Sequence, residues 1–229
     1  MKTAAIILAA GSGKRMGAGQ NKLFLTLQGK AVLQYTVEAL QRSGQIDGLV
    51  LVTKAGEMEQ VRQLVPQTAF DKILTYTTGG RERQDSVLCG LEALPDGYDR
   101  VLIHDGARPL VTEQLLTALL AAVRPDCGAV AAVPAKDTIK RADADGMVQE
   151  TLVRSQLWNV QTPQCFYTAP ILRCYRQAQR DGYQGTDDAS IAERYGLAVK
   201  LVPSYYENIK LTTPEDLDVA EVFLRRLGL

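Results

Sequence analysis

Short apolar runs alternate with longer amphipathic stretches along most of this chain. The short runs are rich in Val, Ile, Leu and Ala, which is typical of strands buried on both faces of a parallel sheet. They cover residues 4–9, 48–53, 72–77, 100–104, 129–133 and 197–202. The amphipathic stretches predict helices at residues 32–42, 57–64, 83–94, 113–123, 169–180 and 214–227. This alternation predicts an α/β fold: a three-layer Rossmann-like sandwich around a mostly parallel, mixed sheet.

One segment, residues 137–161, breaks the alternation. There, Asp145 and Gly146 lie between two polar runs with β propensity, which is a hairpin signal. We predict a projecting β-hairpin arm on a single domain that spans residues 1–229. Because an isolated hairpin is marginally stable in water, we expect the arm to pack against a second copy of the chain and form a homodimer. The alternative is a hairpin folded against its own domain.

The overall charge is balanced, with 26 Lys and Arg residues against 26 Asp and Glu residues. No net field therefore favours nucleic acid or an anionic membrane surface, and an anion site has to come from local clustering. The first apolar run is too short for a convincing signal peptide, and no later run approaches the roughly 18 apolar residues of a membrane span. We expect a soluble, cytoplasmic protein without nucleic-acid or membrane partners.

The cysteines and the single histidine limit the possible chemistry. The four cysteines are scattered with no C-x-x-C pair, so zinc-ligand spacing is absent and reduced, unpaired thiols are expected. A nucleophile–histidine mechanism would have to rely on His104, the only histidine of the chain. The composition therefore favours chemistry that depends on positioned charge.

A glycine-rich, cationic segment follows the first predicted strand. Its glycines, Gly11 and Gly13, free backbone N–H groups to form a concavity that attracts anionic oxygens, and Lys14, Arg15 and Lys22 add fixed charge. The spacing does not match a P-loop or a dinucleotide-binding turn. We interpret the segment as a polyphosphate cradle. The alternative is an ordinary βα turn with solvated basic residues.

Polar residues also follow the other predicted strands, at the sheet edge where open parallel sheets bind ligands. Gly80 allows close backbone approach, and Ser86 lies near a helix start, which favours an anion or a carbonyl. Asp105 ends a buried strand and is a suitable carboxylate for a Mg²⁺ ion that also contacts substrate phosphates. The alternative for Asp105 is a local ion pair with Arg108.

Eight sequence segments, taken in order, resemble the 2-C-methyl-D-erythritol 4-phosphate cytidylyltransferase family of the non-mevalonate isoprenoid pathway. They are residues 9–16, Lys22 and residues 79–87, 104–109, 136–138, 161–164, 186–190 and 207–217. The resemblance runs from residue 4 to residue 224. Two local departures are Asn21-Lys22-Leu23 in place of the usual Pro-Lys-Gln, and Gly106 where Ala is common.

The resemblance implies a nucleotidyltransferase that converts CTP and 2-C-methyl-D-erythritol 4-phosphate to CDP-methylerythritol and pyrophosphate, with Mg²⁺ or another divalent cation. It implies that Arg15 and Lys22 stabilise the transition state, while Arg154 and Lys210 position methylerythritol phosphate. The implied CTP-binding residues are Ala10, Gly11, Ser12, Gly13, Lys14, Gly80, Arg83, Ser86, Gly106 and Ala107. The implied residues around the second substrate are Asp105, Arg108, Thr138, Thr162 and Thr186, and Asp105 is also the implied metal ligand.

Three alternatives remain at this stage. A ribitol-5-phosphate cytidylyltransferase has the same fold, although its loop usually reads Ala-Gly-Gly where this chain has Ala9-Ala10-Gly11. A sugar-1-phosphate nucleotidyltransferase shares the first loop but lacks the segments at residues 104–109 and 208–210. A catalytically silent nucleotide sensor has no need of the cations of an in-line transfer.

The resemblance also implies a homodimer. Arg154 and Thr162 lie in or beside the predicted arm, so one subunit would complete its neighbour's site.

Overall fold

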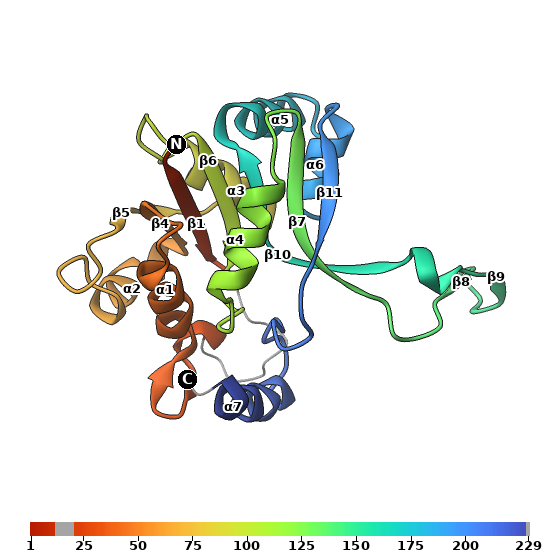
Figure 1. The fold of residues 1–229 in the computed structure, drawn as a ribbon, viewed down its shortest axis with the longest axis horizontal. Helices are drawn as coiled ribbons and strands as arrows, with labels where there is room; N and C mark the ends of the chain where they lie inside the picture. The colour runs from red at the N-terminus through yellow and green to blue at the C-terminus, as the bar shows by residue number, and fades with distance from the viewer. Residues whose placement is uncertain (12–20, 228–229) are drawn as a thin grey trace.

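A computed structural model describes residues 1–11 and 21–227, and it has one central sheet with helices on both faces (Figure 1). The seven strands lie in the order β11-β7-β10-β6-β1-β4-β5. They are β1 (Thr3–Ala9), β4 (Gly48–Thr53), β5 (Ile73–Thr78), β6 (Arg100–Asp105), β7 (Cys127–Pro134), β10 (Trp158–Tyr167) and β11 (Ala198–Pro203). All neighbouring pairs are parallel except those of β10, so the predicted mixed α/β sandwich is confirmed.

The helices cover the sheet in two layers. They are α1 (Val32–Arg42), α2 (Met58–Leu64), α3 (Arg83–Glu92), α4 (Glu113–Ala122), α5 (Thr168–Arg180), α6 (Asp188–Arg194) and α7 (Glu215–Leu227). The buried side chains of α1, α2, α4 and α7 form one core with one face of the sheet, and those of α3, α5 and α6 form a second core with the other. All six predicted strands and six predicted helices are present, within two residues of the predicted ends.

Continuous apolar strands explain why both faces are covered. Every residue of β4 is buried, and alternate residues of β1 contribute to the two cores: Ala5 and Ile7 to one, Ile6 to the other. Helix α3 packs closely on this sheet, because a Cβ at Gly90 would lie only 2.6 Å from Cγ2 of Ile6. The sheet is therefore rigidly held, and its carboxyl edge is a stable platform for polar residues.

Sequence periodicity did not predict strand β10 of the central sheet, nor the short helix α6. Strand β10 begins at Trp158, so residues 158–161, which we assigned to the arm, lie in the sheet. Pro163 lies inside the strand, and such a proline usually argues against a central strand because it has no N–H to donate. The register with β7 shifts between Val160 and Gln164, and this irregularity accommodates the proline.

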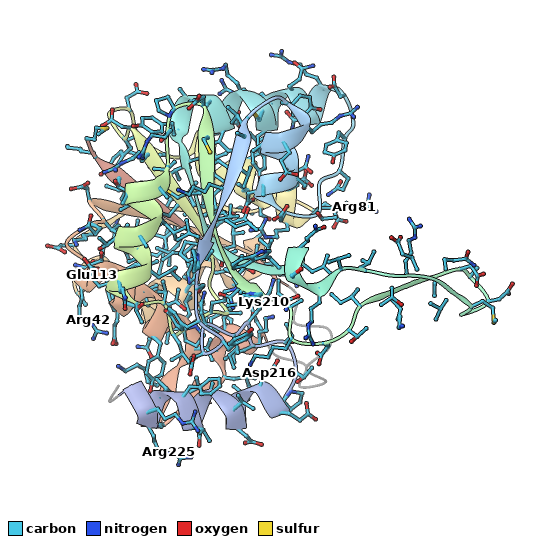
Figure 2. The ribbon with its side chains drawn as sticks, turned by 45° about the vertical axis from the view of Figure 1, so that its right-hand side comes forward. Arg42, Arg81, Glu113, Lys210, Asp216 and Arg225 are labelled. Atoms are coloured by element: carbon cyan, nitrogen blue, oxygen red, sulfur yellow. The ribbon has the colours of Figure 1, made fainter. Side chains whose placement is uncertain are left out.

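The segment between β7 and β10 contains a hairpin that extends away from the sheet (Figures 1 and 2). Strands β8 (Lys140–Ala142) and β9 (Val148–Thr151) pair antiparallel. Asp143 closes the turn by accepting hydrogen bonds from the N–H groups of Asp145 and Met147, and Gly146 has a φ of 81°. Met147 is 67% exposed, so the hairpin has apolar surface that its own chain does not cover.

Within residues 1–11 and 21–227, no helix combines the length and the apolar content needed to cross a membrane.

Candidate active site

A pocket of about 680 Å³ opens where the strand order reverses, at the carboxyl ends of β1 and β6. Open α/β sheets bind ligands at such a switch point. The two strand ends are tied together by the Gly106 N–H, which donates to the Leu8 carbonyl at 3.0 Å. A Cβ at Gly106 would lie 2.9 Å from that oxygen, so this position requires glycine or a local shift. Gly106 thus supports the pocket without lining it.

Most of the predicted residues that the structure describes do line this first pocket. They are Ala10, Gly11, Lys22, Gly80, Arg83, Ser86, Asp105, Ala107 and Lys210. The predicted residues Ser12, Gly13, Lys14 and Arg15 lie outside the described residues. The fold therefore brings these residues together in one pocket, from segments as far apart in the sequence as Ala10 and Lys210.

The start of α3 forms one wall of the first pocket. The Asp85 carboxylate accepts the N–H of Glu82 at 3.0 Å, which fixes the first turn of the helix. A Cβ at Gly80 would lie 2.3 Å from Cβ of Asp85, so only glycine fits against this turn without rearrangement. Ser86 donates its hydroxyl to the Glu82 carbonyl at 3.1 Å, which leaves its oxygen able to accept a hydrogen bond from a ligand.

Asp105 is the charged centre of the site. Its Oδ1 is 3.3 Å from Nε of Arg83, and its Oδ2 is 2.7 Å from Nζ of Lys210. Burial opposes ionisation of Asp105, but Arg83, Lys210 and Arg108 outweigh it and hold the pKa of the carboxyl well below its usual range. Asp105 is therefore ionised at neutral pH and fixes two cations at the carboxyl edge of the sheet. Lys210 lies near the centre of the molecule in Figure 2.

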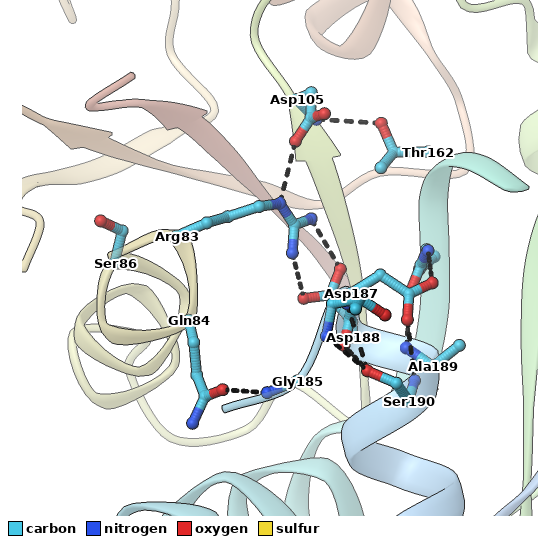
Figure 3. Close-up of polar contacts among 12 residues, drawn as sticks. Arg83, Gln84, Ser86, Asp105, Thr162, Gly185, Asp187, Asp188, Ala189 and Ser190 are labelled. Carbon is cyan, nitrogen blue, oxygen red and sulfur yellow. Dashed lines mark hydrogen bonds and ion pairs between the residues drawn. The ribbon is translucent and has the colours of Figure 1, made fainter. Parts of the chain in front are cut away.

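Arg83 is held from its other side by Asp188, which the sequence analysis did not identify (Figure 3). The guanidinium makes two hydrogen bonds of 2.8 Å to the fully buried Asp188 carboxylate, and the Tyr175 hydroxyl donates to the same carboxylate. Burial alone would lower the pKa of Arg83, but Asp188 and Asp105 raise it. The signal was the second acid in the pair Asp187-Asp188. Asp187, the first acid of the pair, is the N-cap of α6.

A second pocket of about 490 Å³ adjoins the first, and both are lined by Arg83, Asp105 and Lys210. The predicted residues Arg108, Thr162 and Thr186 also line the second pocket. Its far wall is the loop before α6. Gln84 holds this loop by accepting the N–H of Gly185 at 2.8 Å (Figure 3). Gln164 accepts the N–H of Ala189, in the first turn of α6, at 2.8 Å.

A buried hydrogen-bond chain lies behind the second pocket. Nε2 of His104 is 3.1 Å from the carbonyl oxygen of Arg108, which only accepts, so Nε2 carries the proton. Nδ1 then accepts from the Thr162 hydroxyl at 3.1 Å, and the Thr162 oxygen accepts the Asp105 N–H at 3.0 Å. Burial lowers the pKa of His104 to about 4, so the ring is neutral. His104 lines neither pocket and serves as a structural support.

Arg108 is itself 9% exposed and donates from Nη1 to the Asn208 carbonyl at 2.6 Å. Asn208 is fully buried and donates to the Thr162 carbonyl and to Oε1 of Gln161, each at 3.0 Å. These contacts fix the segment that carries Lys210 against β10. Burial lowers the pKa of Arg108, and its carboxylate neighbour Asp105 opposes that shift.

Two predicted residues lie away from both pockets. Thr138 is exposed at the base of the hairpin segment, and Arg154 is exposed in the 3₁₀ turn η4 (Arg154–Gln156), where its Nη1 donates to the Lys136 carbonyl at 3.1 Å. Neither residue lines the first or the second pocket.

Conversely, Lys54 lines the first pocket and was not predicted. It directly follows β4, so collecting polar residues after every strand, the second included, would have found it.

Asp105 is the one predicted metal ligand. Among residues 1–11 and 21–227, no three or more His, Cys, Asp or Glu side chains gather in a way that would hold a metal ion. The donor set still fits Mg²⁺ shared with phosphates, because such ions take one or two protein carboxylates and fill their other positions with phosphate oxygens and water. Each Asp105 oxygen has one cationic partner and retains a second lone pair.

Comparison with known proteins gives a consistent result. The sequence profile of the family described as 2-C-methyl-D-erythritol 4-phosphate cytidylyltransferase matches residues 3–226. Proteins of that name from Geobacillus kaustophilus and Syntrophus aciditrophicus are 46% and 43% identical over 224 and 226 residues, covering 98% of this chain and 97% of their own lengths.

Solved structures agree with the sequence relatives. The structure of 4-diphosphocytidyl-2C-methyl-D-erythritol synthase from Anaerococcus prevotii has a TM-score of 0.87 at 32% identity, covering 98% of this chain and 96% of its own. The structure of 2-C-methyl-D-erythritol 4-phosphate cytidylyltransferase from Thermus thermophilus has a TM-score of 0.78 at 30% identity, covering 98% and 100%.

Proposed function

Because the chain belongs to the 2-C-methyl-D-erythritol 4-phosphate cytidylyltransferase family, we propose that its two adjoining pockets are the place where CTP meets 2-C-methyl-D-erythritol 4-phosphate. The enzyme transfers the cytidylyl group of CTP to methylerythritol phosphate and gives CDP-methylerythritol and pyrophosphate. The observation that carries the placement is that both pockets share Arg83, Asp105 and Lys210. Two anionic substrates can approach each other only where cations lie between them.

The chemistry needs alignment and charge neutralisation more than proton transfer. An oxygen of the acceptor phosphate attacks the α-phosphorus of CTP, the new P–O bond forms, and the bond from the α-phosphorus to the bridging oxygen breaks. The electron pair of that bond leaves with pyrophosphate. The attacking oxygen is already ionised, so no general base is required. The neutral, buried His104 is consistent with this, since it lines neither pocket.

We assign the first pocket to CTP and the second to the acceptor. The glycine-rich segment at residues 10–14, together with Gly80, Arg83, Ser86, Gly106 and Ala107, would bind CTP, with Gly106 acting through the strand contact described above. Lys22 and Arg15 would stabilise the pentacoordinate transition state, and Lys210 would position the acceptor phosphate. Support comes from the cations on the wall that the two pockets share and from Arg108, Thr162 and Thr186 around the second pocket.

The bound metal and the assembly are also proposals. Mg²⁺ held by Asp105 and the CTP phosphates would neutralise charge on the leaving pyrophosphate. We propose a homodimer in which the projecting part of the arm, residues 137–157, brings Thr138 and Arg154 to the neighbouring subunit's acceptor site. Support comes from the exposure of both residues on the projecting segment, away from the pockets of their own chain.

The proposed reaction is tested by pyrophosphate release with each nucleoside triphosphate, against methylerythritol phosphate and ribitol 5-phosphate. We expect release only with CTP and methylerythritol phosphate. The ribitol alternative is not favoured, because the relatives named above carry the methylerythritol name. Comparable release with ribitol 5-phosphate would overturn the acceptor assignment.

A further inference from the structure

Asn21 is a buried amide directly before Lys22, and none of the roles above uses it. Its side chain is 6% exposed. Oδ1 accepts the N–H of Leu23 at 3.2 Å and so caps the 3₁₀ turn η2 (Lys22–Phe24), which carries the lysine. Nδ2 donates to the Ala9 carbonyl at the end of β1, at 3.3 Å, and to Oε2 of Glu57 at 2.7 Å.

We propose that Asn21 and Glu57 are positioning residues that hold Lys22 in the orientation needed for cytidylyl transfer; this rests on the proposed function of Lys22. A lysine side chain is flexible, so its effectiveness at a developing charge depends on how firmly its backbone is held. Asn21 anchors the chain immediately before Lys22, and Leu23, which is 3% exposed, packs into the core immediately after it.

Glu57 is suited to the anchoring role because it belongs to the turn that follows β4. Its N–H donates to the Lys54 carbonyl at 2.9 Å, within the 3₁₀ turn η3 (Ala55–Glu57). A carboxylate makes a stronger acceptor for Nδ2 than a neutral group would. This turn therefore supplies Lys54 to the first pocket and holds Lys22 through Asn21, so the ends of β1 and β4 are linked at the site.

A double-mutant cycle separates positioning from general stability. We expect Lys22→Ala to lower kcat by about a hundredfold or more, as for loss of one preorganised charge contact. Asn21→Ala should lower kcat by about tenfold while changing the KM for methylerythritol phosphate by less than about twofold, because it weakens an interaction that Lys22 makes only in the transition state. In the Lys22→Ala background, Asn21→Ala should cost no further activity.

Gln41→Ala is the matched control. Gln41 also donates to a carboxylate, Asp71, and accepts a backbone N–H, that of Lys72 at 3.2 Å, but it lines neither pocket. Because Gln41 is less buried than Asn21, we expect Gln41→Ala to lower the unfolding temperature by no more than Asn21→Ala does and to leave kcat unchanged. Equal losses of kcat in the two variants would overturn the proposal.

If Asn21→Ala fails to fold, exchanging the amide and the carboxylate between residues 21 and 57 tests the Asn21–Glu57 hydrogen bond. Asn21→Asp places a second carboxylate against Glu57, and adding Glu57→Gln restores one donor and one acceptor. We expect kcat to recover severalfold in the double variant relative to Asn21→Asp, and no recovery would overturn the positioning role. A wild-type kcat for Lys22→Ala would instead remove the proposed function of Lys22. Two results would overturn the positioning role alone while Lys22→Ala still has a low kcat. One is a wild-type kcat for Asn21→Ala, and the other is that the kcat losses of the two single variants add in the double variant.

Discussion

His104 shows what a single buried residue contributes to this site. It is the only histidine in the chain and is fully buried. Its two ring nitrogens contact the Arg108 carbonyl and the Thr162 hydroxyl, and both of these residues line the second pocket. The neutral ring accepts the Thr162 hydroxyl, whose oxygen in turn accepts the N–H of Asp105. Protonating the ring would remove that acceptor and bury a charge, so the group has a direct effect on stability.

We predict that stability falls between pH 6.5 and pH 4 because of His104. Its pKa is lowered from 6.5 to about 4 on folding, so in this window the unfolded chain binds the proton and the folded chain does not. The stabilisation is complete above pH 6.5 and is lost progressively as the pH falls to 4, by up to about 3 kcal/mol. Urea unfolding at pH 7 and at pH 4.5 measures this loss.

The control for this prediction is His104→Gln, which cannot titrate. We expect the stability of this variant to depend much less on pH in the same window, whatever its absolute stability. Asp105 does not interfere, because its lowered pKa means that its contribution is lost only below its ordinary value of 3.8. An equal pH slope in both proteins would show that His104 is not responsible.

Residue identities at the site were predictable where a short motif carried them, and unpredictable where the partner came from distant sequence. Gly80, Ser86 and Asp105 were predicted because each follows a strand. Asp188 was not predicted as the partner of Arg83, because 105 residues separate them and only the fold brings them together. Side-chain contacts at that separation leave no periodic signal in one sequence.

At the scale of elements, α6 is held in place by the ion pair at its first residue. Asp188 begins the helix, is fully buried, and binds Arg83 at the start of α3 while accepting the Tyr175 hydroxyl from α5. Three helices therefore meet at one carboxylate on one face of the sheet. This junction fixes the wall between the two pockets, because Arg83 lines both.

We predict that Asp188→Asn destabilises the protein by about 2–3 kcal/mol. Removing one partner of a buried pair usually costs about 3–5 kcal/mol, and the lower value reflects the 31% exposure of the Arg83 side chain and its remaining contact with Asp105. Tyr175→Phe removes one hydrogen bond to a carboxylate and should cost about 1.5 kcal/mol. Urea denaturation measures both.

Asp188→Asn should also impair catalysis more than Tyr175→Phe does. A loosened Arg83 raises the KM of both substrates, since both pockets share its side chain. The comparison variant is Arg176→Ala, whose ion pair with Glu92 also joins α5 to α3 but is exposed; it should cost less than about 0.5 kcal/mol. If Asp188→Asn matched Arg176→Ala in stability and KM, the junction at Asp188 would have no special role.

Periodicity predicted the parallel strands and the helices well, because each buries a continuous or amphipathic pattern. Strand β10 was missed for a physical reason: its interior contains Gln161, Pro163 and Gln164, which are polar or lack a donor. Gln164 is tolerated in the sheet because Ala189 donates to its oxygen and its nitrogen donates to Asp187 at 2.9 Å. Those partners lie in α6 or at its N-cap, so the strand depends on tertiary contacts.

At the scale of the whole molecule, the projecting segment carries two residues that the family resemblance associates with the acceptor substrate. Arg154 and Thr138 lie on the projecting segment and line neither pocket of their own chain. The hairpin also exposes Met147 and Val148, which are neighbours in the sequence, and contiguous exposed apolar surface can mark a protein–protein contact. In the proposed homodimer, each arm would therefore serve the acceptor pocket of the other subunit.

We predict that two impaired variants restore activity when they are mixed within one dimer. Lys22→Ala disables the core of a site, and Arg154→Ala disables an arm, raising the KM for methylerythritol phosphate more than that for CTP. In a shared-site heterodimer, one site combines the intact core of one subunit with the intact arm of the other. With random pairing, about a quarter of wild-type activity should return on co-expression or subunit exchange, because half the dimers are mixed and each has one intact site.

The matched control is a mixture of Lys22→Ala with Lys210→Ala. Both residues belong to the core of the site, so each mixed dimer has one defect in each site and no activity returns. If the arm served its own subunit, the Lys22→Ala and Arg154→Ala mixture would likewise show only the summed activity of its two components. Light scattering on the same samples establishes that dimers are present, and a monomeric mass at micromolar concentration would contradict the shared site at once.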